Sequence, residues 1–284
     1  MAHTSPLINV MVQAAQKAAK GLTRDFGEVE NLQVSKKGPS DFVSSADLFA
    51  EKKLREALEK ARPDFGFLLE EGGRVEGKDH SNTWIIDPLD GTTNFLHGFP
   101  HWCISIALER DSDIHAGVIY DPIKDDLFWA EKGQGAFWND RRMRVANRLH
   151  LDEAIVATDV PGIGRGDHSE ILGTLGQVMR SVAGVRRTGS AALDLAYVAA
   201  GKLDAYWEKD VNAWDVAAGV AMVREAGGIV SDLKGERKCH HAGHIIAANT
   251  PIHTQLMKHV GMEKPMSPTA ARRAAKKKAK EASD

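Results

Sequence analysis

Two aspartates flank a short turn in the stretch WIIDPLDGTTNFLHGFP, which covers residues 84–100. Asp87 and Asp90 come directly after three bulky apolar residues, and a Gly-Thr-Thr sequence follows the second aspartate. Carboxylates at the end of a strand, beside carbonyls that a turn frees, are the hard oxygen ligands that Mg²⁺ prefers. The Gly-Thr-Thr segment would open a helix, and the first N–H groups of a helix attract phosphate. The spacing therefore points to phosphoryl chemistry at this turn.

A plain strand–turn–helix junction with Asp90 as an ordinary N-cap is the structural alternative. Two further acidic positions weigh against it. Glu70 ends an apolar run, and Asp215 stands after a tryptophan at the start of the apolar-periodic segment DVAAGVAMVREAGG. An aspartate at a helix start is most often only a cap, but the small residues after Asp215 indicate close packing there. Three acidic ends converging at one edge of an α/β sheet would lie where ligands usually bind.

Hydrophobic periodicity predicts the elements that must position these acids. Helices are expected over residues 6–20, 42–58, 168–182, 191–200 and 215–226. Strands are expected over residues 65–70, 84–86, 103–109, 116–121, 126–131, 135–139, 154–158, 205–208, 228–231 and 245–249. The four strands from residue 103 to residue 139 have the spacing of an antiparallel meander. Helices and strands alternate in the second half, which predicts a layered α/β fold, and the polar stretch 140–150 marks a boundary between two lobes.

Composition limits the class of protein. The 284 residues are 43% hydrophobic and 27% charged, enough for a large core in one domain or two modest lobes. A net charge of −2 argues against a body built to bind nucleic acid or a membrane surface. Two cysteines make no disulfide framework. The N-terminus is a poor signal peptide, and no window is long and apolar enough to span a bilayer. We therefore expect a cytoplasmic protein without membrane partners.

The last segment, SPTAARRAAKKKAKEASD (residues 267–284), changes character. It is rich in alanine and holds six Lys and Arg residues against two acids. We expect a solvated, disordered tail. A contact with nucleic acid or a protein partner is the alternative for such a charge block.

Four segments together resemble the inositol monophosphatase family of Mg²⁺-dependent, lithium-sensitive phosphatases. WIIDPLDGTTNFLHGFP is similar to the family's first signature and WDVAAGVAMVREAGG to its second, while GPSDFVSSAD and LLEEG resemble its two upstream acidic elements. The resemblance covers residues 6–260 and implies an α/β/α/β/α sandwich, as in fructose bisphosphatases, and a homodimer. It gives an N-terminal α+β lobe over residues 1–145 with most metal ligands, a C-terminal α/β lobe over residues 146–262 that completes the site, and a basic tail over residues 263–284.

The resemblance also implies a set of metal ligands for two to three Mg²⁺ ions. Glu70, Asp87 and the backbone carbonyl of Leu89 would hold one ion. Asp87, Asp90 and Asp215 would hold a second. A third and weaker ion would share Glu70 and be ordered through water near Asp47.

The family's chemistry implies in-line hydrolysis of a phosphate monoester. A water held by a cation and polarised by Glu70 and Thr92 would attack phosphorus, with Asp90 as a further catalytic group and no covalent intermediate. The segment RRTGSAALDLAYVAAGKLDAYWE resembles the part of the family that faces the substrate hydroxyls. The implied substrate-binding residues are Asp90, Gly91, Thr92, Thr93, Ala191 through its backbone, and Glu208. From the residues alone, Glu208 is more simply a solvated acid at a strand end.

We expect hydrolysis of small polyol phosphates, with myo-inositol monophosphate as the first candidate. Phosphatases for fructose 1,6-bisphosphate, adenosine 3′,5′-bisphosphate or histidinol phosphate are alternatives, because the metal site is common to them. A regulatory protein that keeps the fold and works through RNA polymerase or RNA is the alternative from another class, and the basic tail is compatible with it.

Three other patterns are less persuasive. The glycine-rich residues 162–166 lack the third glycine of a G-x-G-x-x-G loop. Cys239, His240, His241 and His244 lack a second cluster of ligands, so a polar loop is favoured over a zinc site. Cys103 lies in the apolar WCISIAL and is expected to be a small core residue.

Overall fold

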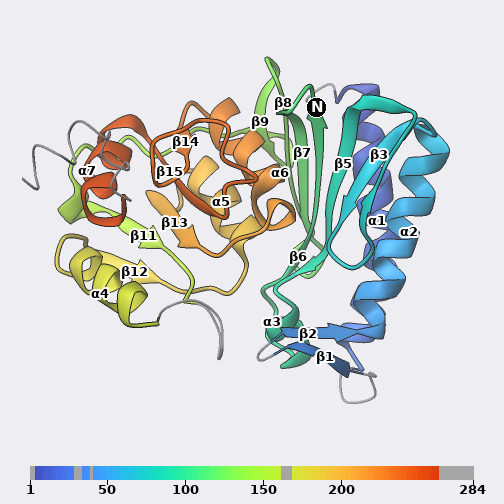
Figure 1. Ribbon diagram of the computed structural model, residues 1–284, viewed down its shortest axis with the longest axis horizontal. Coiled ribbons are helices and arrows are strands. Elements are labelled where there is room, and N and C mark those ends of the chain that lie inside the picture. Colours follow the sequence, from blue (N-terminus) through green and yellow to red (C-terminus); the bar gives the residue numbers. More distant parts are fainter. Residues whose placement is uncertain (1–3, 29–33, 39–40, 161–167, 262–284) are drawn as a thin grey trace, which may run out of the picture.

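The structure is a computed structural model that describes residues 4–28, 34–38, 41–160 and 168–261. Five layers follow one another across the molecule (Figure 1): two helices, a large sheet, two helices, a smaller sheet and two outer helices. The predicted α/β/α/β/α sandwich is therefore confirmed. Among the described residues, no helix is long and apolar enough to cross a membrane. The predicted tail lies outside the described residues.

The first layer consists of α1 (Pro6–Phe26) and α2 (Ser45–Ala61), which cover the outer face of the large sheet (Figure 1). The side chain of Ser5 caps α1 by accepting a hydrogen bond from the N–H of Ile8. Proline at the first helical position loses no hydrogen bond, because that N–H has no partner within a helix. The sequence thus contains both signals that start α1.

The predicted start of α2 at residue 42 is wrong. Residues 41–44 form strand β2 (Asp41–Ser44), which pairs antiparallel with β1 (Val34–Gly38). The helix begins only at Ser45. The adjacent aromatic and β-branched residues Phe42 and Val43 favour extended backbone, but their pairing partners, six and eight positions earlier, cannot be read from apolar periodicity.

The large sheet has eight strands in the order β10-β9-β8-β7-β6-β5-β3-β4. They are β3 (Phe65–Leu69), β4 (Gly73–Val75), β5 (Asp79–Asp90), β6 (Cys103–Arg110), β7 (Asp113–Asp121), β8 (Asp126–Glu131), β9 (Gly135–Trp138) and β10 (Arg141–Arg142). The meander β6 to β9 is antiparallel, as predicted. Only β3 and β5 pair in parallel in this sheet, within the described residues. Both faces of β5 are buried, because Trp84 and Ile86 pack under the first helix layer and Ile85 under the second.

The central helix layer consists of α5 (Ala191–Ala199) and α6 (Ala213–Glu225), which lie between the two sheets (Figure 1). The small residues near the start of α6 allow a very close approach. A Cβ on Gly219 would lie 2.4 Å from the Cβ of Leu195 on α5, closer than two carbon atoms can approach. The close packing predicted from these small residues is confirmed.

The smaller sheet has the strand order β12-β11-β13-β15-β14. Its strands are β11 (Ile155–Ala157), β12 (Gly184–Arg186), β13 (Ala205–Lys209), β14 (Ile229–Ser231) and β15 (His244–Ala248). The outer helices α4 (His168–Met179) and α7 (Thr250–Val260) cover its far side (Figure 1). Strand β12 and helix α7 were not predicted.

Two short elements complete the described chain, α3 (Thr92–Leu96) and the 3₁₀ turn η2 (Leu151–Glu153). The chain passes from the large sheet to the smaller one through residues 143–150, inside the expected boundary. The division into two lobes stays a prediction.

Candidate active site

Two of the acidic segments meet because β3 and β5 are adjacent and parallel. Their register pairs Leu69 with Ile86, so the next residues, Glu70 and Asp87, lie side by side where β3 ends. The N–H of Glu70 donates to the carbonyl of Ile86 at 3.3 Å, which fixes the start of the turn after β3. The parallel pairing thus brings together two carboxylates that are seventeen positions apart in the sequence.

The third acidic segment is the start of α6, which lies on the inner face of the large sheet. Asp87 pairs in register with Ser105 of β6, whose hydroxyl donates to the backbone carbonyl of Trp214 at 3.4 Å. Asp215 is therefore the residue directly after Trp214, whose carbonyl contacts the strand that pairs with Asp87. It lies at the third position of α6 and accepts a hydrogen bond from the N–H of Asn212 at 2.7 Å. Asp215 thus also has the capping role that is common for an aspartate at a helix start.

The pKa of Asp87 reflects its burial and the charges of the other carboxylates. Asp87 is buried, and burial raises the pKa of its carboxyl well above the usual range. Three neighbouring carboxylates raise this pKa further, those of Glu70, Asp90 and Asp215. Such a group of like charges is unfavourable without a cation, whereas a bound cation reverses the local effect on the pKa. Since every donor is a carboxylate or carbonyl oxygen, the residues fit Mg²⁺.

The segment from Asp87 to Thr92 turns at the end of β5, where the register with β6 shifts between Asp87 and Asp90, and side chains hold it in place. Asp87 Oδ1 accepts from the N–H of Leu89 at 2.9 Å. The hydroxyl of Thr92 lies 3.0 Å from the carbonyl oxygen of Leu89 and 3.3 Å from Oδ1 of Asp47. Asp47, in the first turn of α2, is buried. The turn thus gathers the Leu89 carbonyl, the Thr92 hydroxyl and the Asp47 carboxylate in one place.

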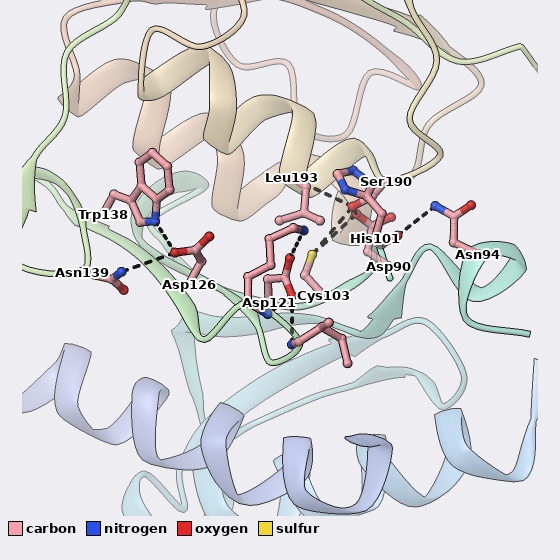
Figure 2. A network of polar contacts seen from close by, with 12 residues as sticks. Asp90, Asn94, His101, Cys103, Asp121, Asp126, Trp138, Asn139, Ser190 and Leu193 are labelled. Atoms are coloured by element: carbon pink, nitrogen blue, oxygen red, sulfur yellow. Dashed lines mark hydrogen bonds and ion pairs between the residues drawn. The ribbon is translucent and has the colours of Figure 1, made fainter. Parts of the chain in front are cut away.

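Asp90 does not cap the helix that follows it, contrary to the structural alternative considered above. Gly91 is the N-cap of α3, with φ +94° and no side-chain cap. The carboxylate of Asp90 turns the other way, toward the start of α5. Its Oδ2 accepts from the hydroxyl of Ser190 and from the N–H of Ala192, the latter at 2.8 Å. Figure 2 shows Asp90, Cys103 and Ser190 converging at this point.

These contacts and burial together determine the pKa of Asp90. Burial raises the pKa of Asp90 to about 6, while hydrogen bonds from Ser190, Ala192, Cys103 and Ala191 oppose that rise. The Ala191 contact is made by its backbone, so this residue, expected to face the substrate, lies beside Asp90. At neutral pH the carboxylate is ionised and available to a cation.

Gly91 is required by the close approach of the chain. A Cβ at this position would lie 3.1 Å from the carbonyl oxygen of His101 and 3.3 Å from that of Gly189, and its φ disfavours other residues. Thr93 follows at the exposed surface of α3. The glycine therefore lets the segment around residue 189 pack against the turn.

Glu208 is not the solvated strand-end acid that the residues alone favoured. It is half-buried on β13 and accepts a hydrogen bond from the hydroxyl of Tyr206. Burial raises the pKa of Glu208 well above its usual range, although the Tyr206 bond opposes this. The carboxylates of Asp159, Asp215 and Asp90 raise it further, so Glu208 interacts electrostatically with the acidic cluster.

A cavity of about 460 Å³ opens beside these residues. Its lining includes the predicted residues Glu70, Gly91, Thr92 and Thr93 together with Asn94, Phe99, Asp159, Arg187, Thr188 and Gly189. A larger cavity of about 720 Å³ elsewhere has five Lys and Arg residues among its twelve lining residues and contains none of the carboxylates around Asp87. The smaller cavity is therefore the candidate active site.

Sequence reasoning missed several lining residues. Arg187 donates to Oδ1 of Asp159 at 2.6 Å and so places a guanidinium at the cavity. Asn94 donates to the carbonyl oxygens of His101 and Thr188 at 2.8 and 2.9 Å, which ties α3 to the segment before α5 (Figure 2 shows the first contact). Each contact joins distant parts of the chain, and no local pattern announces it.

Two other expectations can be compared with the site. Cys103 is fully buried, as predicted, and burial raises the pKa of its thiol well above the usual range. It therefore lacks the thiolate of a nucleophile, although its Sγ lies 3.8 Å from Asp90. The glycine-rich residues 162–166 lie outside the described residues.

A model of the inositol monophosphatase family matches residues 3–263. The chain belongs to this family. It is 56% identical over 263 residues to an inositol-1-monophosphatase of Mesorhizobium japonicum, covering 93% of this chain and 98% of that one. It is 46% identical over 230 residues to the Nus factor SuhB of Xylella fastidiosa, covering 81% and 83%.

The crystal structure of the extragenic suppressor protein suhB from Bartonella henselae has a closely similar fold. The two chains superpose with a TM-score of 0.87 at 54% sequence identity, over 90% of this chain and 98% of that one. The expected membership of the inositol monophosphatase family is confirmed over nearly the whole described chain. The family is one of metal-dependent phosphatases, which agrees with the oxygen-rich cluster around Asp87.

Proposed function

We propose that this protein hydrolyses small polyol phosphate monoesters with Mg²⁺, and that myo-inositol monophosphate is its first substrate. The observation that carries the proposal is the interaction of three carboxylates with the buried Asp87, one of which, Glu70, lines a cavity together with Arg187 and residues of α3. The name of the Mesorhizobium japonicum relative supports the choice of inositol monophosphate.

We assign the metal ligands as the family resemblance implies them. Glu70, Asp87 and the Leu89 carbonyl would hold one Mg²⁺, and Asp87, Asp90 and Asp215 a second. Asp47 would orient the water of a third ion, which its contact with Thr92 supports. When bound, a pair of such ions activates water at neutral pH and stabilises negative charge on the attacking and leaving oxygens.

The chain's own residues would position and deprotonate the nucleophile. Glu70 lines the cavity and would accept a proton from the attacking water. The hydroxyl of Thr92, already within reach of Leu89 and Asp47, would orient that water. N–H groups of Gly91, Thr92 and Thr93 would donate to the phosphate oxygens that gain charge.

Substrate hydroxyls would be recognised on the side of the smaller sheet. Glu208 interacts electrostatically with the acidic cluster, and the backbone of Ala191 hydrogen-bonds to Asp90. Arg187 lines the cavity and would neutralise a phosphate or hydrogen-bond a sugar hydroxyl. A cyclitol with many hydroxyl groups suits such a polar wall better than an apolar alcohol.

The test is phosphate release from a panel of monoesters with and without Mg²⁺. The panel contains myo-inositol 1-phosphate, fructose 1,6-bisphosphate, adenosine 3′,5′-bisphosphate, histidinol phosphate and a generic aryl phosphate. We expect Mg²⁺-dependent release with the highest kcat/KM for inositol monophosphate. A higher value for another member would move the assignment to that phosphatase, and no Mg²⁺-dependent release from any member would refute the proposal.

A regulatory role beside the phosphatase is the second candidate. The 46% identity to a protein named Nus factor SuhB favours it, and the basic tail is a suitable contact for RNA or RNA polymerase. Deleting residues 263–284 should leave phosphatase activity intact and weaken any association with RNA polymerase in a pull-down. An unchanged pull-down would exclude the tail as the contact.

Two further features belong to the proposal. We infer a cytoplasmic enzyme, which the two free and buried cysteines support. We also infer a homodimer, which light scattering of the purified chain would test.

A further inference from the structure

A second group of potential metal ligands lies outside the active site. Oε1 of Glu109 is 2.8 Å from Nε2 of His240 and 3.1 Å from Nε2 of His241. The three ligand atoms all lie within 4.8 Å of one another. We call Glu109, His240 and His241 the Glu109 cluster.

The fold brings these residues together from opposite halves of the chain. Glu109 is the penultimate residue of β6, in the large sheet, while the histidines lie in the loop between β14 and β15 of the smaller sheet. The side chain of Asp232 shapes that loop by accepting from the N–H groups of Lys234 and Glu236 at 2.8 and 2.7 Å. The cluster thus connects the half of the chain that forms the large sheet directly to the half that forms the smaller sheet.

The sequence alone favours a plain polar loop over a zinc site at these histidines. That preference rests on the lack of a second group of ligands near Cys239, His240, His241 and His244. The structure supplies Glu109, 131 residues earlier than His240. His244 does not join, because its Nδ1 accepts from the N–H of Leu233.

The cluster has the chemistry and the access that a transition metal needs. Two imidazole nitrogens and one carboxylate oxygen suit Zn²⁺ and the neighbouring divalent transition metals, whereas Mg²⁺ prefers oxygen ligands alone. Ligand atoms about 2.0–2.1 Å from a tetrahedral Zn²⁺ lie about 3.3 Å apart. The two distances from Oε1 of Glu109, 2.8 and 3.1 Å, are close to that value, and the two Nε2 atoms lie within 4.8 Å of each other. The His240 side chain is 3% exposed and that of His241 is 48% exposed, so the cluster has a fixed inner side and an open outer side.

We propose that Glu109, His240 and His241 bind one Zn²⁺ ion, with a fourth position open to water. To bind the ion, each imidazole would be neutral with its one proton on Nδ1, so that the Nε2 lone pairs and Oε1 of the ionised Glu109 point to the ion. The site is separate from the catalytic one. Six residues of extended strand, about 20 Å, separate Glu109 from Cys103 beside Asp90.

Such an ion would join β6 to the β14–β15 loop and thus stabilise the packing between the halves. A ligand that binds only the folded chain raises its stability in proportion to the logarithm of its concentration. Zn²⁺ would therefore raise the thermal midpoint even when the catalytic site is saturated with Mg²⁺.

The test is calorimetric titration of the full chain with Zn²⁺ in excess Mg²⁺ at neutral pH, with thermal melts of the same samples. We expect one Zn²⁺ per chain at this site. His241→Gln should weaken its binding by about tenfold or more and abolish the Zn²⁺-induced rise of the midpoint. His241 is half exposed, so this variant should fold and keep its Mg²⁺-dependent activity.

Matched variants separate the cluster from other Zn²⁺ sites. The exposed His80→Gln should bind Zn²⁺ as the unmodified chain does. Asp87→Asn, which disables the acidic cluster, should keep the site, whereas His240→Gln should lose it. Equal Zn²⁺ affinity in the unmodified, His240→Gln and His241→Gln chains, or no saturable Zn²⁺ binding in excess Mg²⁺, would overturn the proposal.

Discussion

The carboxylate of Asp90 accepts a hydrogen bond from the hydroxyl of Ser190, one hundred positions later in the chain. Ser190 is also the N-cap of α5, where its Oγ accepts from the N–H of Leu193 at 3.3 Å. One hydroxyl group therefore starts a helix of the second half and orients a predicted metal ligand of the first half. Figure 2 shows Ser190 between Asp90 and Leu193.

Replacing Ser190 by alanine should affect both stability and metal use. Loss of the cap should lower the free energy of unfolding by about 1 kcal/mol. Loss of the contact to Asp90 should raise the Mg²⁺ concentration for half-maximal activity by about tenfold. Denaturant unfolding and Mg²⁺ titrations of activity measure the two effects. The control is Ser5→Ala, which removes the cap of α1 alone and should leave the Mg²⁺ titration unchanged; an equal shift there would contradict the role given to Ser190.

Asp87→Asn should remove nearly all phosphatase activity, with kcat/KM lower by more than about a hundredfold, because the change removes a charge that we assign to both metal ions. The same change should stabilise the metal-free chain, since it relieves repulsion among four carboxylates. Thermal melts in a chelator and in Mg²⁺ test this: the midpoint in the chelator should rise and the Mg²⁺-induced increase should shrink. Near-normal turnover with Mg²⁺ would refute the two-metal assignment.

Lithium should inhibit the enzyme when Mg²⁺ is abundant. The resemblance to a lithium-sensitive family implies this, and the second proposed site, formed by Asp87, Asp90 and Asp215, is where a small cation would compete after the first Mg²⁺ is bound. Initial rates at increasing Li⁺, with K⁺ at matched ionic strength as the control, provide the measurement. Complete insensitivity to Li⁺ would count against the second site.

His101 should make the fold sensitive to acid. Burial, aided by Lys124, lowers the pKa of His101 from 6.5 to about 4, and its Nε2 has no hydrogen-bond partner among the described residues. The unfolded chain binds a proton near pH 6.5 and the folded chain only near pH 4. As the pH is lowered from 6.5 to about 4, the free energy of unfolding should therefore fall by about 2 kcal/mol, a value that allows for the partial exposure of the ring.

The variant His101→Gln removes this titration and should flatten the stability profile between pH 6.5 and about 4. The exposed His80→Gln serves as the control and should keep the slope. Denaturant unfolding at several pH values gives both profiles. An identical slope for all three chains would show that other groups cause the acid sensitivity.

Much of this protein could be predicted from local patterns. Local patterns alone predict the cluster around Asp87. They are the D-P-x-D-G turn after an apolar strand, the acid after β3 and the aspartate at the start of α6. These predictions succeed because a buried strand and an amphipathic helix have their own periodicities, and because the ends of adjacent strands meet at one edge of a sheet. The layered fold followed from the same periodicities together with the family resemblance.

Only the tertiary structure decided which residues complete the sites. Asp90 turns to α5 instead of α3, Glu208 is drawn toward the acidic cluster, and Arg187 reaches the cavity through Asp159. Likewise, Glu109 meets His240 and His241 across 131 residues. Each of these contacts depends on how the two sheets pack around α5 and α6, and that packing is fixed by burial over the whole core rather than by any short segment of sequence.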